Sequence, residues 1–231
     1  MVPFIVKAML SIVIPTLNEA TRLEKVLAGL GAVDFTLEII ISDGGSTDTT
    51  LETAQNFGTR IVAAPKGRGQ QLAAGADACS GAWLLFLHAD TVLGRGWRQI
   101  VDDFLVDSAN LNKAGIFKFA LDDPSPAARR LEKIVHWRSR YLGLPYGDQG
   151  LLISRAFYNE VGGFRAMPLY EDVDIIRRIG RQRQVLLDIP AVTSATRYHH
   201  SGYFLRPLRN FACLSLYFVG LPPRLIGRLY Q

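Results

Sequence analysis

The sequence predicts an α/β protein whose mostly parallel central sheet is flanked by helices. Short apolar runs that fit buried strands alternate with segments whose apolar residues recur at helical spacing. Several of these runs end in a cluster of polar residues, as expected where a buried parallel strand leaves the core. The 231 residues, 48% of them apolar, are enough for one domain with a packed core.

The first half of the chain predicts a strict alternation of strand and helix. Leu23, Val26, Leu27 and Leu30 recur at helical spacing and so predict a helix over 20–30. Ser46 or Thr47 is expected to cap a second helix that ends near Gly58. A third helix is expected over 70–79, and the expected strands are 12–14, 37–41, 60–64 and 82–87.

The second half follows a less regular pattern. In the strand expected over 113–121, Phe117, Phe119 and Leu121 share one face, which we expect to be buried. The remaining expected elements are helices over 97–106 and 126–142, a strand over 151–153, a helix closed by Gly162 and Gly163, and a helix opened by Glu171.

The positive charge of the chain is concentrated at its C-terminal end. The net charge is +5, no acidic residue follows Asp188, and five arginines do: Arg197, Arg206, Arg209, Arg224 and Arg228. The apolar run 211–221 is too short to span a bilayer but suits its interface. We therefore divide the chain into a domain over 1–202 and a basic apolar helical tail over 203–231. The tail either contacts a membrane surface, forms a homo-oligomer interface or packs as a core helix.

Cysteine usage and the first residues favour a reducing compartment. Cys79 and Cys213 lie in unrelated contexts that suggest neither a disulfide framework nor a zinc site. No signal peptide is recognisable before the first expected strand. We expect a cytoplasmic protein, peripheral on the inner membrane face if the tail contacts lipid. No nucleic-acid-binding motif is present, so nucleic acid is not an expected partner.

Polar side chains follow three of the expected parallel strands. Thr16, Asn18 and Glu19 follow the first strand, Asp43 the second, and Asp90 the run Trp83–Leu87. Because parallel strands end at the same edge of a sheet, these side chains should converge on one crevice. Each of them alone fits ordinary turn or cap chemistry, so their convergence carries the argument. The Asp43 carboxylate is suited to accept a hydrogen bond from a nucleobase N–H.

Asp90 is a candidate metal ligand. Hard divalent cations such as Mg²⁺ usually bind through one or two carboxylates together with substrate phosphates. His88 lies two residues before Asp90 and is a second candidate ligand. The alternative for Asp90 is a turn-capping role.

Two further segments are candidates for chemistry. Gly67, Arg68 and Gln70 form a glycine-containing turn into a helix, where phosphate or ribose can approach the backbone. The spacing from this turn to Asp90 resembles that of a dinucleotide-binding motif, but the third glycine of that motif is missing. The sequence contains no Walker A motif. Glu171 and Asp172 open a helix, where acidic residues are favoured by the helix dipole, but where a general base is also well placed.

Four ordered motifs resemble the family 2 glycosyltransferases of GT-A fold, over roughly residues 9 to 200. They are Ser11–Glu19, Ser42–Asp48, His88-Ala89-Asp90 and Glu171-Asp172. Gly147–Gly150 and Arg197-Tyr198 are similar to a compact bacterial subgroup associated with radical-SAM and selenium or arsenosugar pathways.

The resemblance implies inverting transfer of a sugar from a nucleotide-diphosphate donor with a divalent metal, Mg²⁺ or Mn²⁺. It implies that Pro15, Thr16, Glu19 and Asp43 hold the nucleoside, that Asp90 binds the metal, and that Asp172 deprotonates the acceptor hydroxyl. Glu171 and Asp148 are the next candidates for the base. Asp148 and Gln149 are also expected near the acceptor or the sugar, and the acceptor itself is not specified.

One motif departs from the family pattern. The first aspartate of the family's Asp-x-Asp is His88 here, which puts the affinity or identity of the metal in doubt. His199 or His200 could add a ligand, and Arg197 could pair with the diphosphate.

Two rival functions remain open. A sugar-nucleotide pyrophosphorylase should carry a glycine-rich loop with Arg and Lys after the first strand, but residues 15–20 contain no glycine and no basic residue. A non-catalytic nucleotide-binding, membrane-associated protein is favoured by His88 and disfavoured by the intact Glu171-Asp172 pair.

Overall fold

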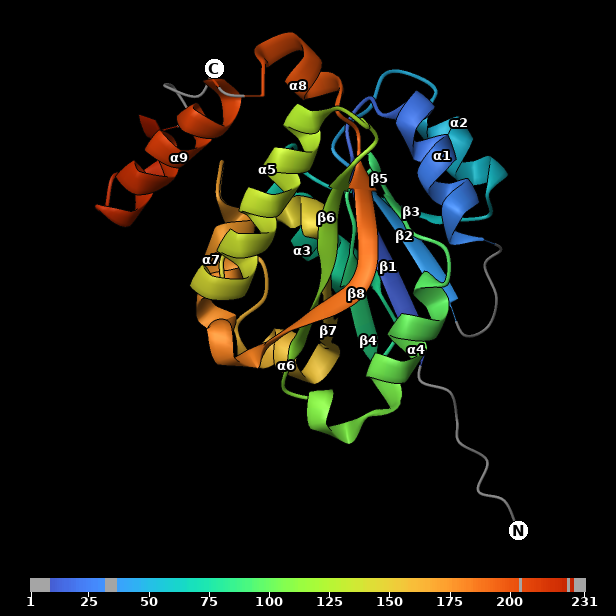
Figure 1. Cartoon of the computed structure of the whole chain (residues 1–231). Helices are drawn as coiled ribbons and strands as arrows, with labels where there is room; N and C mark the ends of the chain where they lie inside the picture. The colour runs from blue at the N-terminus through green and yellow to red at the C-terminus, as the bar shows by residue number, and fades with distance from the viewer. Residues whose placement is uncertain (1–8, 32–36, 204, 224, 227–231) are drawn as a thin grey trace.

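The computed structural model describes residues 9–31, 37–203, 205–223 and 225–226. The described chain forms an eight-stranded sheet, in the order β3-β2-β1-β4-β7-β6-β8-β5, with helices on both faces (Figure 1). This confirms the predicted α/β class. Within this part of the chain, no helix is both long and apolar enough to cross a membrane.

The first half of the chain builds a parallel sheet. Its strands are β1 (Leu10–Thr16), β2 (Leu37–Asp43), β3 (Arg60–Ala63) and β4 (Trp83–Phe86). β1 pairs in parallel with β2 and β4, and β2 pairs in parallel with β3. The register sets Thr16 opposite Asp43, so the polar residues that end β1 and β2 lie side by side.

The second half adds four strands of mixed direction. They are β5 (Thr91–Leu93), β6 (Ala114–Leu121), β7 (Leu151–Ser154) and β8 (Gln184–Thr193). β7 runs antiparallel to β4 and β6, β5 runs antiparallel to β8, and β6 and β8 are parallel. Phe117, Phe119 and Leu121 of β6 are buried, which confirms the predicted inner face.

Helices cover both faces of the sheet (Figure 1). α1 (Ala20–Leu30) and α4 (Trp97–Val106) close one hydrophobic core, and α2 (Thr50–Asn56) packs against α1. α3 (Arg68–Ala78), α6 (Arg155–Glu160) and α7 (Glu171–Ile179) close the core on the other face. Short 3₁₀ turns lie at Ser108–Asn110, at Gly147–Gln149 (η3) and at Arg181–Arg183.

The end of the sheet nearest the C-terminus carries a third group of helices. α5 (Pro126–Trp137) packs on β6 and continues into one π-helical segment, η2 (Arg138–Leu142). α8 (Thr196–Ser201) and α9 (Leu205–Phe218) follow β8. The expected tail helix therefore exists over the part that is described, whereas Arg224 and Arg228 lie outside the described residues.

Two predicted boundaries were wrong. The second helix begins at Thr50 rather than after Ser46 or Thr47, because the Ser46 hydroxyl donates to the Asp43 carboxylate instead of capping a helix. The helix expected over 126–142 is α-helical only to Trp137, since the backbone widens into the π-helical turn η2.

Glycine allows α3 to lie very close to the sheet. A Cβ at Gly75 would lie 2.3 Å from Val13 Cγ1, and a Cβ at Gly69 would lie 2.2 Å from the Arg165 carbonyl oxygen. The sequence therefore sets the distance of α3 from β1 and from the segment that leads into α7.

We predict that Gly75→Ala lowers the free energy of unfolding by about 1–3 kcal/mol, because the added methyl group overpacks the contact with Val13. Urea denaturation of the single and double variants measures this. Adding Val13→Ala removes the clashing methyl, so the two substitutions should couple favourably in a double-mutant cycle. Strictly additive losses would contradict the close-packing explanation.

Candidate functional site

The end of β2 is organised around the Asp43 carboxylate. Thr16 Oγ1 donates to Asp43 Oδ1 at 2.9 Å and Ser46 Oγ donates to the same oxygen at 2.5 Å. The backbone N–H groups of Gly45 and Ser46 donate to Oδ2 at 2.9 and 2.8 Å. Burial alone would raise the pKa of Asp43, but these hydrogen bonds outweigh it and hold the pKa below its usual value.

Asn18 and Glu19 join the β1 end to the same turn. Asn18 adopts the left-handed conformation (φ 56°), which asparagine tolerates. Its side-chain oxygen accepts the Thr47 N–H at 2.8 Å. Glu19 accepts a hydrogen bond from Arg22 at 2.7 Å, and its N–H donates to Thr50 Oγ1 at 2.9 Å. The predicted convergence of Thr16, Asn18, Glu19 and Asp43 is therefore present.

Gln71 is a residue of this site that the sequence analysis missed. Its side-chain amide lies on α3 and donates to the carbonyl oxygens of Thr16 (2.6 Å) and Ser42 (3.1 Å). Gly44 passes so close to this amide that a Cβ would lie 3.0 Å from Gln71 Nε2. Gln71 thus joins the ends of β1 and β2 to α3. A single buried glutamine carries no sequence signal for such a role.

The start of α3 brings Gly67, Arg68 and Gln70 to the same side of the molecule. Gly67 precedes the helix with a φ of 140°, which favours glycine. Arg68 is about half exposed and lines a cavity that begins here. Its charge interacts with the carboxylates of Glu171, Asp172, Asp90 and Asp148. Arg68 is therefore the cation shared by four candidate site residues.

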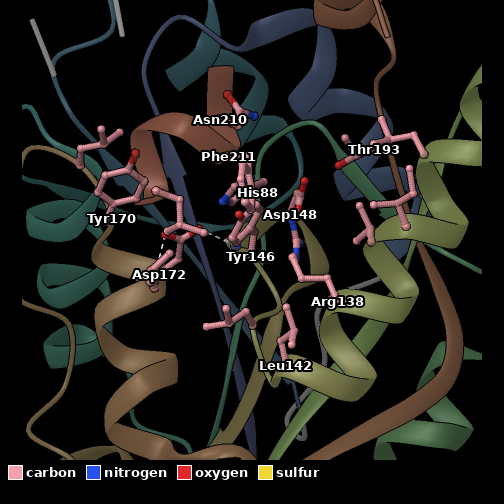
Figure 2. A pocket seen from close by; sticks show the side chains of 18 of the residues that line it. His88, Arg138, Leu142, Tyr146, Asp148, Tyr170, Asp172, Thr193, Asn210 and Phe211 are labelled. Atoms are coloured by element: carbon pink, nitrogen blue, oxygen red, sulfur yellow. Dashed lines mark hydrogen bonds between the residues drawn. The ribbon is translucent and has the colours of Figure 1, made fainter. Parts of the chain in front are cut away.

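The cavity has a volume of about 540 Å³, and Figure 2 shows some of the side chains that line it. Its lining has a polar part and an apolar part, which we call its polar end and its apolar end. The polar end carries the side chains of Arg68, His88, Asp90, Asp148, Glu171 and Asp172. The apolar end is formed by α5, η2 and α9. The structure thus assembles residues from β4, α3, η3 and α7 around one space, as a site for two reactants requires.

Asp172 lies at the first turn of α7 and is fixed by backbone donors. The Gly147 N–H donates to Asp172 Oδ2 at 2.8 Å, and the Val173 N–H donates to Oδ1 at 2.8 Å. His88 lies against the same turn, because a Cβ at Gly147 would lie 2.8 Å from His88 Nε2 and 3.3 Å from Asp172 Oδ2. A side chain at position 147 would therefore force the His88 ring to shift.

Glu171 lies in a different environment from the adjacent Asp172. Its side chain is buried, with Oε1 3.5 Å from Arg68 Nη1. Burial and repulsion from Asp172 raise the pKa of Glu171 to about 7, against the attraction of Arg68. Glu171 is therefore partly protonated near neutral pH and is held by an arginine.

Asp148 and Arg138 face each other across the boundary between the two ends (Figure 2). Burial raises the pKa of Asp148 to about 6, Arg138 opposes this, and Asp172 adds to it. Among the described residues, Asp148 Oδ1 and Arg138 Nε and Nη2 are buried without a hydrogen-bond partner. The Arg138 guanidinium stacks 3.4 Å from the centroid of the Tyr146 ring. The sequence analysis missed Arg138 and Tyr146, although the π-helical turn that carries Arg138 is typical of functional sites.

Asp90 has the environment expected of a metal ligand that works with a substrate. Its carboxylate lies at the cavity, and its Oδ1 receives only a long hydrogen bond from Thr91 Oγ1, 3.4 Å. Among the described residues, no three side chains of His, Cys, Asp or Glu are grouped so that they could hold a metal ion by themselves. A lone carboxylate fits a divalent cation only when phosphate oxygens supply the remaining ligands.

The predicted residues at the ends of β1 and β2 and at the start of α3, apart from Arg68, are not among the residues that line the cavity. Four other predicted residues have no described contact with the cavity either. Gln149 is buried: its side-chain oxygen accepts from Ser139 Oγ at 2.9 Å, and its amide donates to the Phe117 carbonyl at 3.1 Å. These hydrogen bonds hold η3 in place, and the expected contact of Gln149 with the acceptor or the sugar stays a prediction. His199 Nε2 lies 3.7 Å from the Asp123 carboxylate, and its role as a metal ligand stays a prediction.

The other two are Pro15 and Arg197. Pro15 lies within β1, paired with Ser42. The side chains of Arg197 and His200 lie outside the described residues.

Comparison with known proteins identifies the family. The family model "Glycosyl transferase family 2" matches residues 11–160, which include the strand ends and the polar end of the cavity up to Asp148. The chain belongs to glycosyl transferase family 2. A glycosyltransferase of PGL/p-HBAD biosynthesis from Mycobacterium tuberculosis is 40% identical over 95 residues. This match covers 37% of the chain and only 36% of that relative.

Solved structures share the fold. A mannosyltransferase from Pyrobaculum calidifontis, in complex with GDP-Man and Mn²⁺, superposes with a TM-score of 0.66 at 15% identity. The superposition covers 95% of this chain and 67% of the other. Glucosyl-3-phosphoglycerate synthase from M. tuberculosis, with Mn²⁺ and UDP, gives 0.58 at 19% identity, covering 79% and 70%. The chain therefore has the GT-A fold of these transferases.

We predict that Asp43→Asn lowers the free energy of unfolding at pH 7 by about 1–3 kcal/mol, because an amide cannot accept all four hydrogen bonds. The pKa of Asp43 is lower in the folded than in the unfolded state. The ionised Asp43 carboxylate therefore contributes its full stabilisation of the fold above the unfolded-state pKa. This contribution disappears as the pH falls through the folded-state pKa. The stability difference between wild type and variant should therefore shrink below about pH 4.

Denaturant titrations from pH 7 to pH 2 check this. Asp188→Asn is the matched control, because the pKa of this carboxyl is also lowered, but by an exposed pair with Lys118. It should change stability little. If the stability difference between the wild type and Asp43→Asn did not depend on pH, the stabilising role of the ionised Asp43 carboxylate would be contradicted.

Proposed function

We propose that this protein transfers a sugar from a nucleotide-diphosphate donor to an acceptor hydroxyl, with inversion and with a divalent metal. The observation that carries the proposal is that Asp90 and Asp172, from distant parts of the chain, line one cavity. A site for the leaving group and a base that share one space are what a direct displacement requires. The acceptor oxygen forms its bond to the anomeric carbon while the bond to the diphosphate breaks.

The donor nucleoside lies at the ends of β1 and β2 in this proposal. Thr16, Asn18, Glu19 and Asp43 form its floor, and Gly67, Arg68 and Gln70 form its side. All four acceptor positions of Asp43 are engaged by the protein itself. Asp43 therefore fixes the shape of the nucleoside site. A nucleobase N–H must displace one of the four present donors before it can bind the Asp43 carboxylate. The GDP-Man and UDP complexes of the structural neighbours support a nucleotide-sugar partner.

Asp90 would hold the metal together with diphosphate oxygens. Its partly exposed carboxylate lies at the cavity, and the hydrogen bond it receives from Thr91 among the described residues is long. The metal would supply charge that stabilises the departing diphosphate. Arg68 adds a fixed positive charge on the same side of the cavity. The Mn²⁺ in two neighbours supports this part of the proposal.

Asp172 is the proposed base. Its two hydrogen bonds from Gly147 and Val173 fix the direction of its carboxylate. Glu171 is buried and lies 3.5 Å from Arg68, so it is less accessible to an acceptor hydroxyl. It is better placed to position Arg68. The subgroup linked to radical-SAM pathways and the cytoplasmic location stay predictions.

We predict that Asp90→Asn abolishes the metal-dependent part of donor binding and leaves the fold intact, because it removes a ligand charge at a partly exposed strand end. Thermal shift with GDP- and UDP-sugars, with and without Mn²⁺, measures this. At 100 times the Kd the wild type should gain about 5 °C or more. Glu24→Gln, an exposed carboxylate on α1, is the control. Wild-type stabilisation that is unaffected by EDTA would refute the metal role.

We predict that Asp172→Asn reduces turnover by about 10²–10⁴-fold while donor binding is retained, because an amide cannot accept the acceptor's proton. Single-turnover kinetics together with donor thermal shift separate the two steps. If turnover stays near the wild-type rate, the base lies elsewhere, and Asp148 or Glu171 becomes the candidate.

A further inference from the structure

The apolar end of the cavity has no role in the chemistry proposed above. It is lined from α5 and η2 by Leu131, Ile134, Val135, Trp137 and Leu142, and from α9 by Phe211, Leu214 and Phe218. A nucleotide and a metal have no use for such a surface. It opens directly onto the Asp172 end (Figure 2), so whatever fills it lies beside the base.

Much of this lining is exposed to solvent. Five residues both line the cavity and remain about half exposed or more: Ile134 (62%), Trp137 (55%), Leu142 (52%), Phe211 (67%) and Phe218 (45%). Tyr141, Leu208 and Val219 extend the same surface along η2 and α9. Eight of the eleven large apolar side chains that are exposed in the described chain thus belong to this α5–α9 face. Exposed apolar side chains gathered on one face in this way mark a surface that binds an apolar partner or ligand.

Cations accompany these apolar side chains. The Arg177 guanidinium lies 5.0 Å from the ring centroid of Phe218, and the Arg140 guanidinium lies 6.0 Å from that of Tyr141. Arg130 and Lys133 are exposed on α5. Basic and aromatic side chains in this combination are typical of protein surfaces that lie on anionic lipid.

Unpaired polar atoms lie where the apolar surface meets the polar end. Arg138 Nε and Nη2 and Asp148 Oδ1 are buried without partners among the described residues. Buried polar atoms left unpaired are costly, so a ligand that supplies partners is favoured. Such a ligand must both accept hydrogen bonds, from Arg138, and donate them, to Asp148. A hydroxylated head group does both.

We propose that the acceptor is a lipid with a hydroxylated head group, taken from an anionic bilayer on which the α5–α9 face lies. Arg138 and Asp148 bind the head group, and the chain lies between α5 and α9. This rests on the proposed transferase function and names its acceptor class. The lipid hydroxyl loses its proton to Asp172, its oxygen bonds to the anomeric carbon, and the nucleoside diphosphate leaves with the electrons of the broken bond.

A water-soluble acceptor would use only the polar end and would leave the exposed apolar side chains uncovered. A second copy of the chain seated on this face would close the mouth of the cavity. The basic side chains around the mouth also favour an anionic surface over a like-charged copy of the protein. Both alternatives are outcomes of the experiments below.

The first experiment measures binding of hexyl, octyl and decyl β-D-glucoside, each below its micellar concentration, by calorimetry. The proposal expects about a fourfold gain in affinity for each added methylene. In Ile134→Ser/Phe211→Ser this dependence on chain length should flatten. Val106→Ser/Leu111→Ser is the matched control, since these two side chains are equally exposed but lie away from the cavity. Equal affinity along the wild-type series overturns the proposal.

The second experiment uses phosphatidylglycerol–phosphatidylcholine vesicles with brominated acyl chains, which quench tryptophan fluorescence. Of the three tryptophans, Trp83 and Trp97 are 3% and 6% exposed, so Trp137 reports on the α5–α9 face. The vesicles should quench the tryptophan fluorescence of the wild type, and added salt should restore it. The fluorescence of Trp137→Phe should not be quenched. Vesicle binding without quenching, no binding, or a dimer by sedimentation that excludes vesicles would overturn the proposal.

Donor stabilisation by GDP- and UDP-sugars with Mn²⁺ is measured on the same proteins. The serine variants should keep it, because their substitutions lie at the opposite end of the cavity. Absence of donor binding by the wild type would contradict the transferase function. If the wild type binds the donor, but its affinity does not depend on the alkyl chain length or its fluorescence is not quenched, only the lipid acceptor is contradicted.

Discussion

The parallel pairing of β1 with β2 and β4 is the constraint on which the rest of the structure depends. It brings the ends of these strands to one edge, so that Thr16 lies opposite Asp43 and Asp90 follows close by. Gln71 then joins the first two ends to α3 through two carbonyl oxygens. With α3 fixed, Arg68 lies at the cavity, and its charge interacts with the carboxylates of α7 and η3.

The same geometry explains why neighbouring carboxylates differ. Asp172 accepts hydrogen bonds from two backbone N–H groups. Glu171 is buried beside it, and since two adjacent charges repel, the proton is held by the more buried group. Asp148 is also buried, and its pKa is raised to about 6. The site thus holds its excess of negative charge as a mixture of ionised and protonated acids around one arginine, and a bound cation would shift this balance.

The sequence was most informative where the fold depends on local patterns. Apolar runs ending in polar clusters identified the parallel half and its strand ends, and helical spacing gave α1 and α4 with their observed bounds. It was least informative where roles depend on tertiary contacts. Gln149 and Gln71 are chemically alike, yet one holds η3 and the other joins two strands, and neither faces the cavity. Arg138 lay in what looked like an ordinary amphipathic helix, and only the π-helical turn makes it a cavity residue.

Tyr170 shows how the two ends of the cavity are coupled. It precedes α7 in the left-handed conformation (φ 67°), which a bulky side chain adopts only when its surroundings impose it. Its ring lies 4.9 Å from that of Tyr217 on α9, and the next residues along the chain are Glu171 and Asp172. The Tyr170–Tyr217 contact therefore joins α9 to the backbone turn that carries the proposed base. An acceptor chain seated against α9 would favour one position of Asp172, so the apolar end can contribute to catalysis without touching a reacting atom.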